Sequence, residues 1–120
     1  MKVGVDIVDV QRIRTIIDRY ERRFLEKVFT ATEQQYCSQA ANKYERYAGR
    51  FAAKEALRKA LQPFSNAHYL PFTHIEILPD ETGVPIPVIQ TNISFIRPYS
   101  EISVSISHEK NYAVAFAIVE

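Results

Sequence analysis

The chain opens with an alternation of apolar and polar side chains that is typical of a β-strand. Val3, Val5 and Ile7 occupy every second position of residues 2–8, so they share one face of the predicted strand. Asp9 follows directly and is a favourable N-cap, which predicts that a helix begins at the next residue. The apolar positions of that helix form one stripe: Val10, Ile13, Ile17 and Tyr20.

Helical spacing continues over the next fifty residues. A short helical segment carries its apolar side chains between residues 24 and 29. Residues 30–33, Thr-Ala-Thr-Glu, have the form of a capping box, which predicts a helix start there and an end near Asn42. The longest helix is predicted over 43–61, because Pro63 stops it. Residues 62–73 are expected to form an irregular loop.

Beyond residue 73 the pattern becomes that of strands. We predict strands at 74–78 and 102–107, a turn at 79–83, and a last strand at 112–119 that forms a hairpin with the strand before it. A weaker strand at 85–90 contains prolines, which favour an edge or a bulge. The order of strand, helices and β-meander predicts the α+β class, with one long central helix packed on an antiparallel sheet.

Composition and charge narrow the class of protein without identifying it. The 120 residues fit a single domain spanning 1–120, and 47% of them are hydrophobic. The net charge of +1 excludes a strongly polycationic nucleic-acid tail. Cys37 is the single cysteine, which excludes an internal disulfide framework and favours a reducing, cytoplasmic setting. We expect no membrane partner, because no apolar run approaches the roughly 18 residues needed to span a bilayer.

Asp6 is the first residue that suggests chemistry. It lies inside an apolar strand, and a buried carboxylate is costly unless it is paired, hydrogen-bonded or bound to a metal. Gly4 shares its face of the strand, where a missing side chain would let a ligand approach the backbone. The alternative is a structural aspartate at the end of a strand.

The long helix carries the second candidate acid. Glu55 shares a sector with aromatic and small side chains, and Lys59 lies one turn further on. The neighbouring sector carries a basic row of Lys43, Arg50, Lys54 and Arg58. One interpretation is an ordinary Glu–Lys pair on a solvated face. The other is an anion site, in which Asp6 and Glu55 hold a divalent cation such as Mg²⁺ beside substrate phosphates.

His108 ends the alternating strand, after serines at 103, 105 and 107. A histidine at the end of a strand can donate to a phosphate or act as a general acid or base. It can equally be a surface residue of a turn.

These residues, taken together, resemble a known family. The matching segments, in chain order, are Gly4–Val8 with Arg12-Ile13, Phe29-Thr30 with Glu33, Ala48–Ala56 with Lys59-Ala60, Gly83–Pro85, and Val104–His108. Their order and spacing resemble holo-[acyl-carrier-protein] synthase, the short bacterial type of 4′-phosphopantetheinyl transferase. The chain departs from that pattern at 62–71, where relatives usually have a glycine-rich loop and this sequence has no glycine.

The resemblance implies an activity and a set of site residues. Such enzymes move the phosphopantetheine arm of coenzyme A to a serine of apo acyl carrier protein. By match of motifs, Asp6 and Glu55 would hold Mg²⁺, and Lys59 would act with them as the third catalytic residue. Contacts to coenzyme A would come from Arg50, Lys54, Lys59, Ser107 and His108. Contacts to the acidic carrier would come from Arg12, Arg19 and Arg22.

The resemblance also implies a homotrimer with active sites between subunits, so that His108 and Asp6 come from different chains. The base that takes the serine proton stays open between Glu55 and a metal-bound water. A rival hypothesis is a non-catalytic binding module that uses the basic helix face for an acidic protein or a nucleic acid. Nucleic-acid platforms present exposed aromatics among basic residues, and the last two strands offer only Tyr112 and Phe116, so we expect no nucleic-acid partner.

Overall fold

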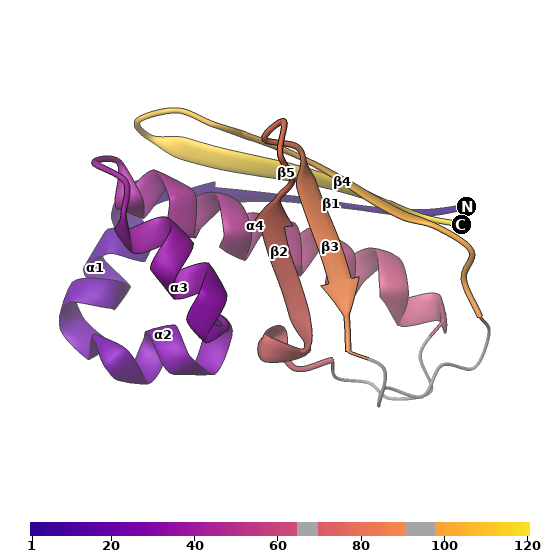
Figure 1. Ribbon diagram of the computed structural model, residues 1–120, viewed down its shortest axis with the longest axis horizontal. Helices are drawn as coiled ribbons and strands as arrows, with labels where there is room; N and C mark the ends of the chain where they lie inside the picture. The colour runs from indigo at the N-terminus through magenta and orange to yellow at the C-terminus, as the bar shows by residue number, and fades with distance from the viewer. Residues whose placement is uncertain (65–69, 91–97) are drawn as a thin grey trace.

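The computed structural model describes residues 1–64, 70–90 and 98–120. The chain folds into a three-stranded sheet, a two-stranded hairpin and a group of helices (Figure 1). The helices are α1 (Val10–Tyr20), α2 (Arg22–Val28), α3 (Ala31–Ser38) and α4 (Lys43–Leu61), with short 3-10 turns η1 (Gln62–Phe64) and η2 (Phe72–His74). The strands are β1 (Lys2–Asp9), β2 (Ile75–Pro79), β3 (Pro85–Ile89), β4 (Ile102–His108) and β5 (Tyr112–Val119). The predicted α+β class is confirmed.

The main sheet has the order β1-β5-β4 and is antiparallel throughout. Lys2 pairs with Val119, so the two ends of the chain lie side by side (Figure 1). Alternation along β5 gives the sheet two different faces. Its alanines at 113, 115 and 117 are buried against helix α4, while Tyr112, Val114 and Phe116 point outward and are exposed.

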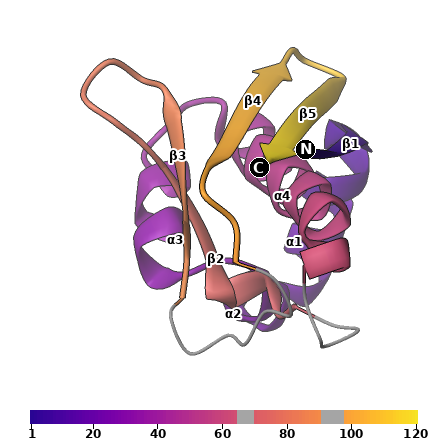
Figure 2. The ribbon, with the colours of Figure 1, turned by 90° about the vertical axis from the view of Figure 1, so that its right-hand side faces the viewer.

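Helix α4 is the centre of the molecule, with the main sheet on one side and the β2–β3 hairpin on the other (Figure 2). Small residues let its backbone come close to the sheet; Ala52, Ala56 and Ala60 are fully buried. Gly4 of β1 is part of the same contact, because a Cβ at this position would overlap the carbonyl oxygen of Ala56. The expectation that Gly4 leaves room for a ligand is therefore wrong: it leaves room for α4.

The helix starts agree closely with the sequence. Asp9 caps α1 by accepting from the backbone N–H groups of Gln11, at 2.8 Å, and Arg12. The capping box predicted from Thr30 and Glu33 is present at the start of α3. Two details differ. Helix α3 ends at Ser38 rather than near Asn42, and Tyr20 is exposed rather than part of the buried stripe of α1.

The hairpin of β2 and β3 forms a separate two-stranded sheet (Figure 1). Within the described residues β3 pairs with β2 alone, so its two prolines occupy an edge strand, as predicted. The glycine-free segment 62–71 falls partly outside the described residues, and its first three residues form η1. Among the described helices none is long and apolar enough to span a membrane.

Candidate active site

Asp6 and Glu55 meet at one pocket. The pocket has a volume of about 230 Å³ and lies where β1, α1 and α4 come together. Arg12 also lines it, and its apolar wall is made of Ile7, Val8, Ile13, Ile16 and Phe51. Asp6 reaches the pocket from the sheet and Glu55 from the helix, 49 positions apart in the chain, so the fold brings the two predicted acids together.

Lys59 lies beside Asp6. Its Nζ donates to an oxygen of the Asp6 carboxylate at 3.2 Å and to the backbone carbonyl of Val5 at 2.9 Å. The Asp6 side chain is only 17% exposed, whereas that of Lys59 is 53% exposed. The ammonium is therefore held over the strand while it remains open to solvent, which is the placement that a cation needs to meet an incoming anion.

Glu55 has a cationic neighbour of its own. Arg58 donates from Nη1 to the Glu55 carboxylate at 3.1 Å, one helical turn away. The Arg58 guanidinium also lies over the ring of Phe72, 4.3 Å from its centroid. Each carboxylate thus lies beside the apolar wall of the pocket and has one cationic neighbour, Lys59 for Asp6 and Arg58 for Glu55.

The donor set suits a hard divalent cation. Mg²⁺ is usually held by one or two carboxylates, with phosphate oxygens and water completing its octahedron. Asp6 and Glu55 supply two such carboxylates on the wall of one open pocket. Among the described residues no group of three or more His, Cys, Asp or Glu side chains gathers in a metal-binding arrangement. The site therefore fits an ion shared with a phosphate substrate better than a closed protein cage.

Arg50 lies on a different side of α4. It is 5% exposed, and its buried Nε has no hydrogen-bond partner within residues 1–64, 70–90 and 98–120. Its guanidinium stacks on the ring of Tyr36 at 4.7 Å, and Arg46 stacks on the same ring at 4.3 Å. Two arginines are thus held together by one aromatic ring, and an anion would offset their mutual repulsion.

Lys54 does not belong to a solvated basic row. It is fully buried, and its Nζ donates to the Glu33 carboxylate at 2.6 Å and to the carbonyl oxygens of Val28 and Phe72. Burial lowers the pKa of Lys54, and the carboxylate of Glu33 opposes that shift. An ammonium has three protons to donate, and all three are used inside the protein. We therefore remove Lys54 from the expected coenzyme A contacts.

His108 lies at the end of β4, on the side of the sheet that faces α4. Its Nδ1 is 3.0 Å from the Glu45 carboxylate, in the first turn of α4. Ser107 points to the opposite face, in register with the outward-facing Val114. The side chains of Ser107 and His108 therefore cannot line the same side of the sheet.

The expected site residues fall into two groups within one chain. Asp6 lies on β1 and His108 on β4, and these are the two edge strands of the main sheet. Helix α4 runs over the strand between them, as Figure 2 shows. The two groups are thus separated by the body of the helix.

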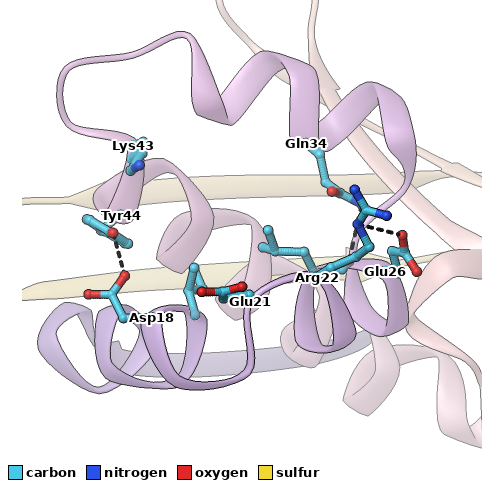
Figure 3. Close-up of a pocket in the computed structure, with 9 residues that line it drawn as sticks. Asp18, Glu21, Arg22, Glu26, Gln34, Lys43 and Tyr44 are labelled. Carbon is cyan, nitrogen blue, oxygen red and sulfur yellow. Dashed lines mark hydrogen bonds and ion pairs between the residues drawn. The ribbon is translucent and has the colours of Figure 1, made fainter.

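The basic residues expected to bind a carrier lie along α1 and the start of α2. Arg12 borders the pocket of Asp6 and Glu55 directly, rather than standing apart from it. Arg19 is exposed, and Arg22 is exposed and 3.6 Å from Glu26. Figure 3 shows Arg22 at a second, larger hollow of about 650 Å³, whose other labelled residues include Asp18, Glu21, Lys43 and Tyr44.

Three residues that matter here were not singled out from the sequence as site residues. Glu33 was interpreted as part of a capping box and of the matching segments, with no role in the site, yet its carboxylate also binds Lys54 and the backbone N–H of Ile77. Glu45 and Tyr36 carried no signal at all, because their partners, His108 and Arg50, are distant or lie across a helix pair. Only the packing reveals them.

Comparison with known proteins gives a consistent result. Residues 2–117 match the model of the 4′-phosphopantetheinyl transferase superfamily. The holo-[acyl-carrier-protein] synthase of Halothermothrix orenii is 42% identical over 98% of this chain and 95% of its own length. That of Chlorobaculum tepidum is 41% identical over 100% of this chain and 98% of its own length.

Solved structures agree with the sequence matches. The Helicobacter pylori holo-[acyl-carrier-protein] synthase in complex with coenzyme A superposes with a TM-score of 0.82 at 31% identity, covering 98% of this chain and 99% of that one. The Bacillus anthracis enzyme, in complex with CoA (3′,5′-ADP), gives a TM-score of 0.79 at 32% identity, covering 98% and 94%. With two carboxylates at one pocket and a lysine hydrogen-bonded to one of them, this chain belongs to the 4′-phosphopantetheinyl transferase superfamily, among the holo-[acyl-carrier-protein] synthases.

Proposed function

We propose that this chain transfers the 4′-phosphopantetheine arm of coenzyme A to a serine hydroxyl of an apo acyl carrier protein. The observation that carries the proposal is the pocket that joins Asp6 and Glu55, with Lys59 hydrogen-bonded to Asp6. The coenzyme A complexes of the H. pylori and B. anthracis enzymes support the same donor. A non-catalytic binding module would have no need for two carboxylates at one pocket with a lysine bonded to one of them.

The reaction is a transfer of a phosphoryl-type group. The serine oxygen forms a bond to the β-phosphorus of coenzyme A and loses its proton. The bond from that phosphorus to the bridging oxygen breaks, and adenosine 3′,5′-bisphosphate leaves with the electron pair on its α-phosphate. In such a transfer the protein mainly positions the two substrates and neutralises the negative charge of the phosphates.

Each pocket residue has a part in this step. Asp6 and Glu55 hold Mg²⁺, which when bound neutralises the charge of the pyrophosphate. Lys59, which is hydrogen-bonded to Asp6 and open to solvent, donates to a non-bridging oxygen of the phosphoryl group under attack. Glu55 is the chain's own candidate to accept the serine proton, because it lines the pocket from the helix side.

The outer contacts follow from the remaining cations. His108 and Arg50 bind phosphates of coenzyme A, and the buried Nε of Arg50 has no hydrogen-bond partner in the part of the chain that the structure describes. Arg12, Arg19 and Arg22 meet the acidic surface of the carrier, which gains association rate and orientation from complementary charge. We place the reaction in the cytoplasm, where a free and buried thiol such as Cys37 stays reduced.

We further propose that the enzyme works as a homotrimer whose outer sheet faces are in contact. Six large apolar side chains lie exposed on this face, in adjacent register on β1 and β5: Val3, Val5, Ile7, Tyr112, Val114 and Phe116. A contiguous apolar patch on a sheet face is typical of an interface. Contact between subunits would also bring the β4 edge of one chain to the β1 edge of the next, which joins His108 to Asp6.

The first experiment measures the intact mass of an apo acyl carrier protein after incubation with the chain, coenzyme A and Mg²⁺. We expect a gain of one phosphopantetheine arm, and no gain when EDTA is present. Glu55→Gln should abolish the gain and leave the melting curve unchanged, whereas the matched Glu101→Gln, at an exposed carboxylate just before β4, should be fully active. No gain with the folded wild-type chain on several carriers would overturn the proposal.

A second experiment tests the shared site. Asp6→Asn and His108→Ala chains are each expected to be inactive or severely impaired alone. After unfolding and refolding together, mixed trimers contain junctions where an intact Asp6 from one chain faces an intact His108 from another, so part of the activity should return. No recovery in trimers shown by light scattering to be mixed would mean that each site is built from one chain.

A further inference from the structure

Glu45 is a charged residue that the proposed reaction does not use. It lies in the first turn of α4, and its side chain is 24% exposed. Its carboxylate is 3.0 Å from Nδ1 of His108, which arrives from the end of β4, 63 residues later in the chain. The contact links the start of the central helix to the end of an edge strand.

The chemistry of this contact fixes the proton on the imidazole. An ionised carboxylate only accepts hydrogen bonds, so Nδ1 of His108 must be the donor. The opposite nitrogen, Nε2, is then left for another partner. When the ring carries both protons, each nitrogen is a donor, so a ring held at Nδ1 presents the N–H of Nε2 to an anion.

The packing around the ring limits its other positions. Gly49 lies one turn along α4, and a Cβ there would be 3.6 Å from Cδ2 of His108 and 3.1 Å from the side chain of Ile106. The strand end therefore lies close against the helix backbone. The imidazole therefore packs beside α4 at Gly49 while Glu45, on the same helix, holds its Nδ1.

We propose that Glu45 is a positioning residue for His108: it holds Nδ1 and so presents Nε2 to a phosphate of coenzyme A. The inference rests on the proposed function, because it requires that His108 binds coenzyme A. It assigns to Glu45 a role in donor binding rather than in the chemical step.

The kinetic test compares Glu45→Ala and Glu45→Gln with the wild type and with Glu101→Gln, a matched loss of charge at an exposed residue just before β4. We expect Glu45→Ala to raise KM for coenzyme A by about tenfold with kcat within about twofold, since hydrogen bonds to charged groups contribute roughly that much. Glu45→Gln keeps an acceptor for Nδ1 and should raise KM by only about threefold. KM for the carrier should not change.

A spectroscopic test does not depend on turnover. Nitrogen-15 NMR of the imidazoles reports which ring nitrogen carries the proton, and the chain has only three histidines. We expect the Nδ1 signal of His108, assigned by its loss in His108→Ala, to be protonated in the wild type. In Glu45→Ala the neutral ring should move toward the Nε2–H form. A purely structural role for Glu45 would lower stability without this change.

The outcomes separate the two proposals. If His108→Ala raises KM for coenzyme A and Glu45→Ala does not, Glu45 has no positioning role and the inference is overturned. If His108→Ala leaves KM unchanged, the coenzyme A contact of His108 fails, and the inference fails with it. If both variants raise KM and the tautomer shifts only without Glu45, the inference holds.

Discussion

Two lysines on helix α4 make the most instructive contrast in the molecule. Lys54 and Lys59 lie five positions apart, and each is paired with a carboxylate from another element. The Lys54–Glu33 pair is 2.6 Å long with both side chains fully buried. The Lys59–Asp6 pair is 3.2 Å long, and the lysine is 53% exposed. One pair is closed to solvent and the other is open to it.

The difference lies in what else each ammonium can reach. Besides Glu33, Lys54 donates to the carbonyls of Val28 and Phe72, so it connects α4 with the end of α2 and with η2. Lys59 makes one further bond, to the carbonyl of Val5, and keeps access to solvent. A substrate anion can therefore approach Lys59. To reach Lys54, an anion would have to displace the carboxylate and carbonyl groups that bind this lysine in the interior.

Removal of the buried ammonium should have the largest effect. Lys54→Ala leaves the Glu33 carboxylate inside the protein without its cation, and breaking a buried pair from one side costs about 3–5 kcal/mol. We expect the free energy of unfolding in urea to fall by about that amount. Lys54→Met combined with Glu33→Gln, which removes both charges, should lose much less. Equal decreases in the free energy of unfolding in the single and double variants would show that the unpaired Glu33 charge is not the cause of the instability.

Removal of the open ammonium should give the reverse pattern. Lys59→Ala is expected to lower kcat by about 10²–10³-fold, as loss of one electrostatic donor to a developing charge typically does. Its effect on the free energy of unfolding should stay within about 1 kcal/mol, because exposed ion pairs stabilise little. Steady-state kinetics and urea unfolding of the same preparation would test both statements. Near-normal kcat would remove Lys59 from the mechanism.

The close approach of β1 to α4 gives an intermediate effect. Gly4→Ala places a methyl group against the backbone of Ala56, and overpacking of this kind costs about 1–3 kcal/mol. Because Asp6 follows on the same face of β1, the shift should also move it relative to Glu55 and Lys59. We expect a weaker apparent affinity for Mg²⁺ in the mass assay. Gly83→Ala is the control for loss of a glycine: open space surrounds that position, and its φ of 91° confines the strain to the hairpin turn.

The contrast between the lysines also shows how far the sequence could predict the structure. Local signals predicted well: the cap at Asp9, the capping box at Thr30 and the alternation of β4 and β5 depend on neighbours in the chain. The pairing of Asp6 with Glu55 was one of two open interpretations of the residues and became a definite expectation only through the resemblance, because spacing cannot show that two distant acids share a pocket.

Lys54 was expected to contact coenzyme A for the same reason: both interpretations of the basic row placed it on an accessible face of the helix. Its helical position is one residue from Glu55, but its environment is set by Glu33, Val28 and Phe72, which come from three other segments. The periodicity of a helix tells which side chains share a face. It does not tell whether that face meets solvent or another layer of the protein.

The smallest expected effect concerns Cys37, whose thiol is buried near the Lys54–Glu33 pair and therefore reports on access to that part of the interior. Its thiol is fully buried, and burial raises its pKa to about 12, although the nearby cations Arg50, Arg46 and Lys54 oppose the shift. Between about pH 9 and 12 the unfolded chain loses this proton and the folded chain keeps it, so the free energy of unfolding falls as the pH rises.

At pH 8 the folded protein should react with iodoacetamide far more slowly than the urea-unfolded chain. Lys59→Ala should leave that slow rate unchanged, whereas a folded Lys54→Ala should react faster, because the opening of its interior exposes the thiol. Equal rates in the two variants would mean that the buried pair does not control access to this part of the core.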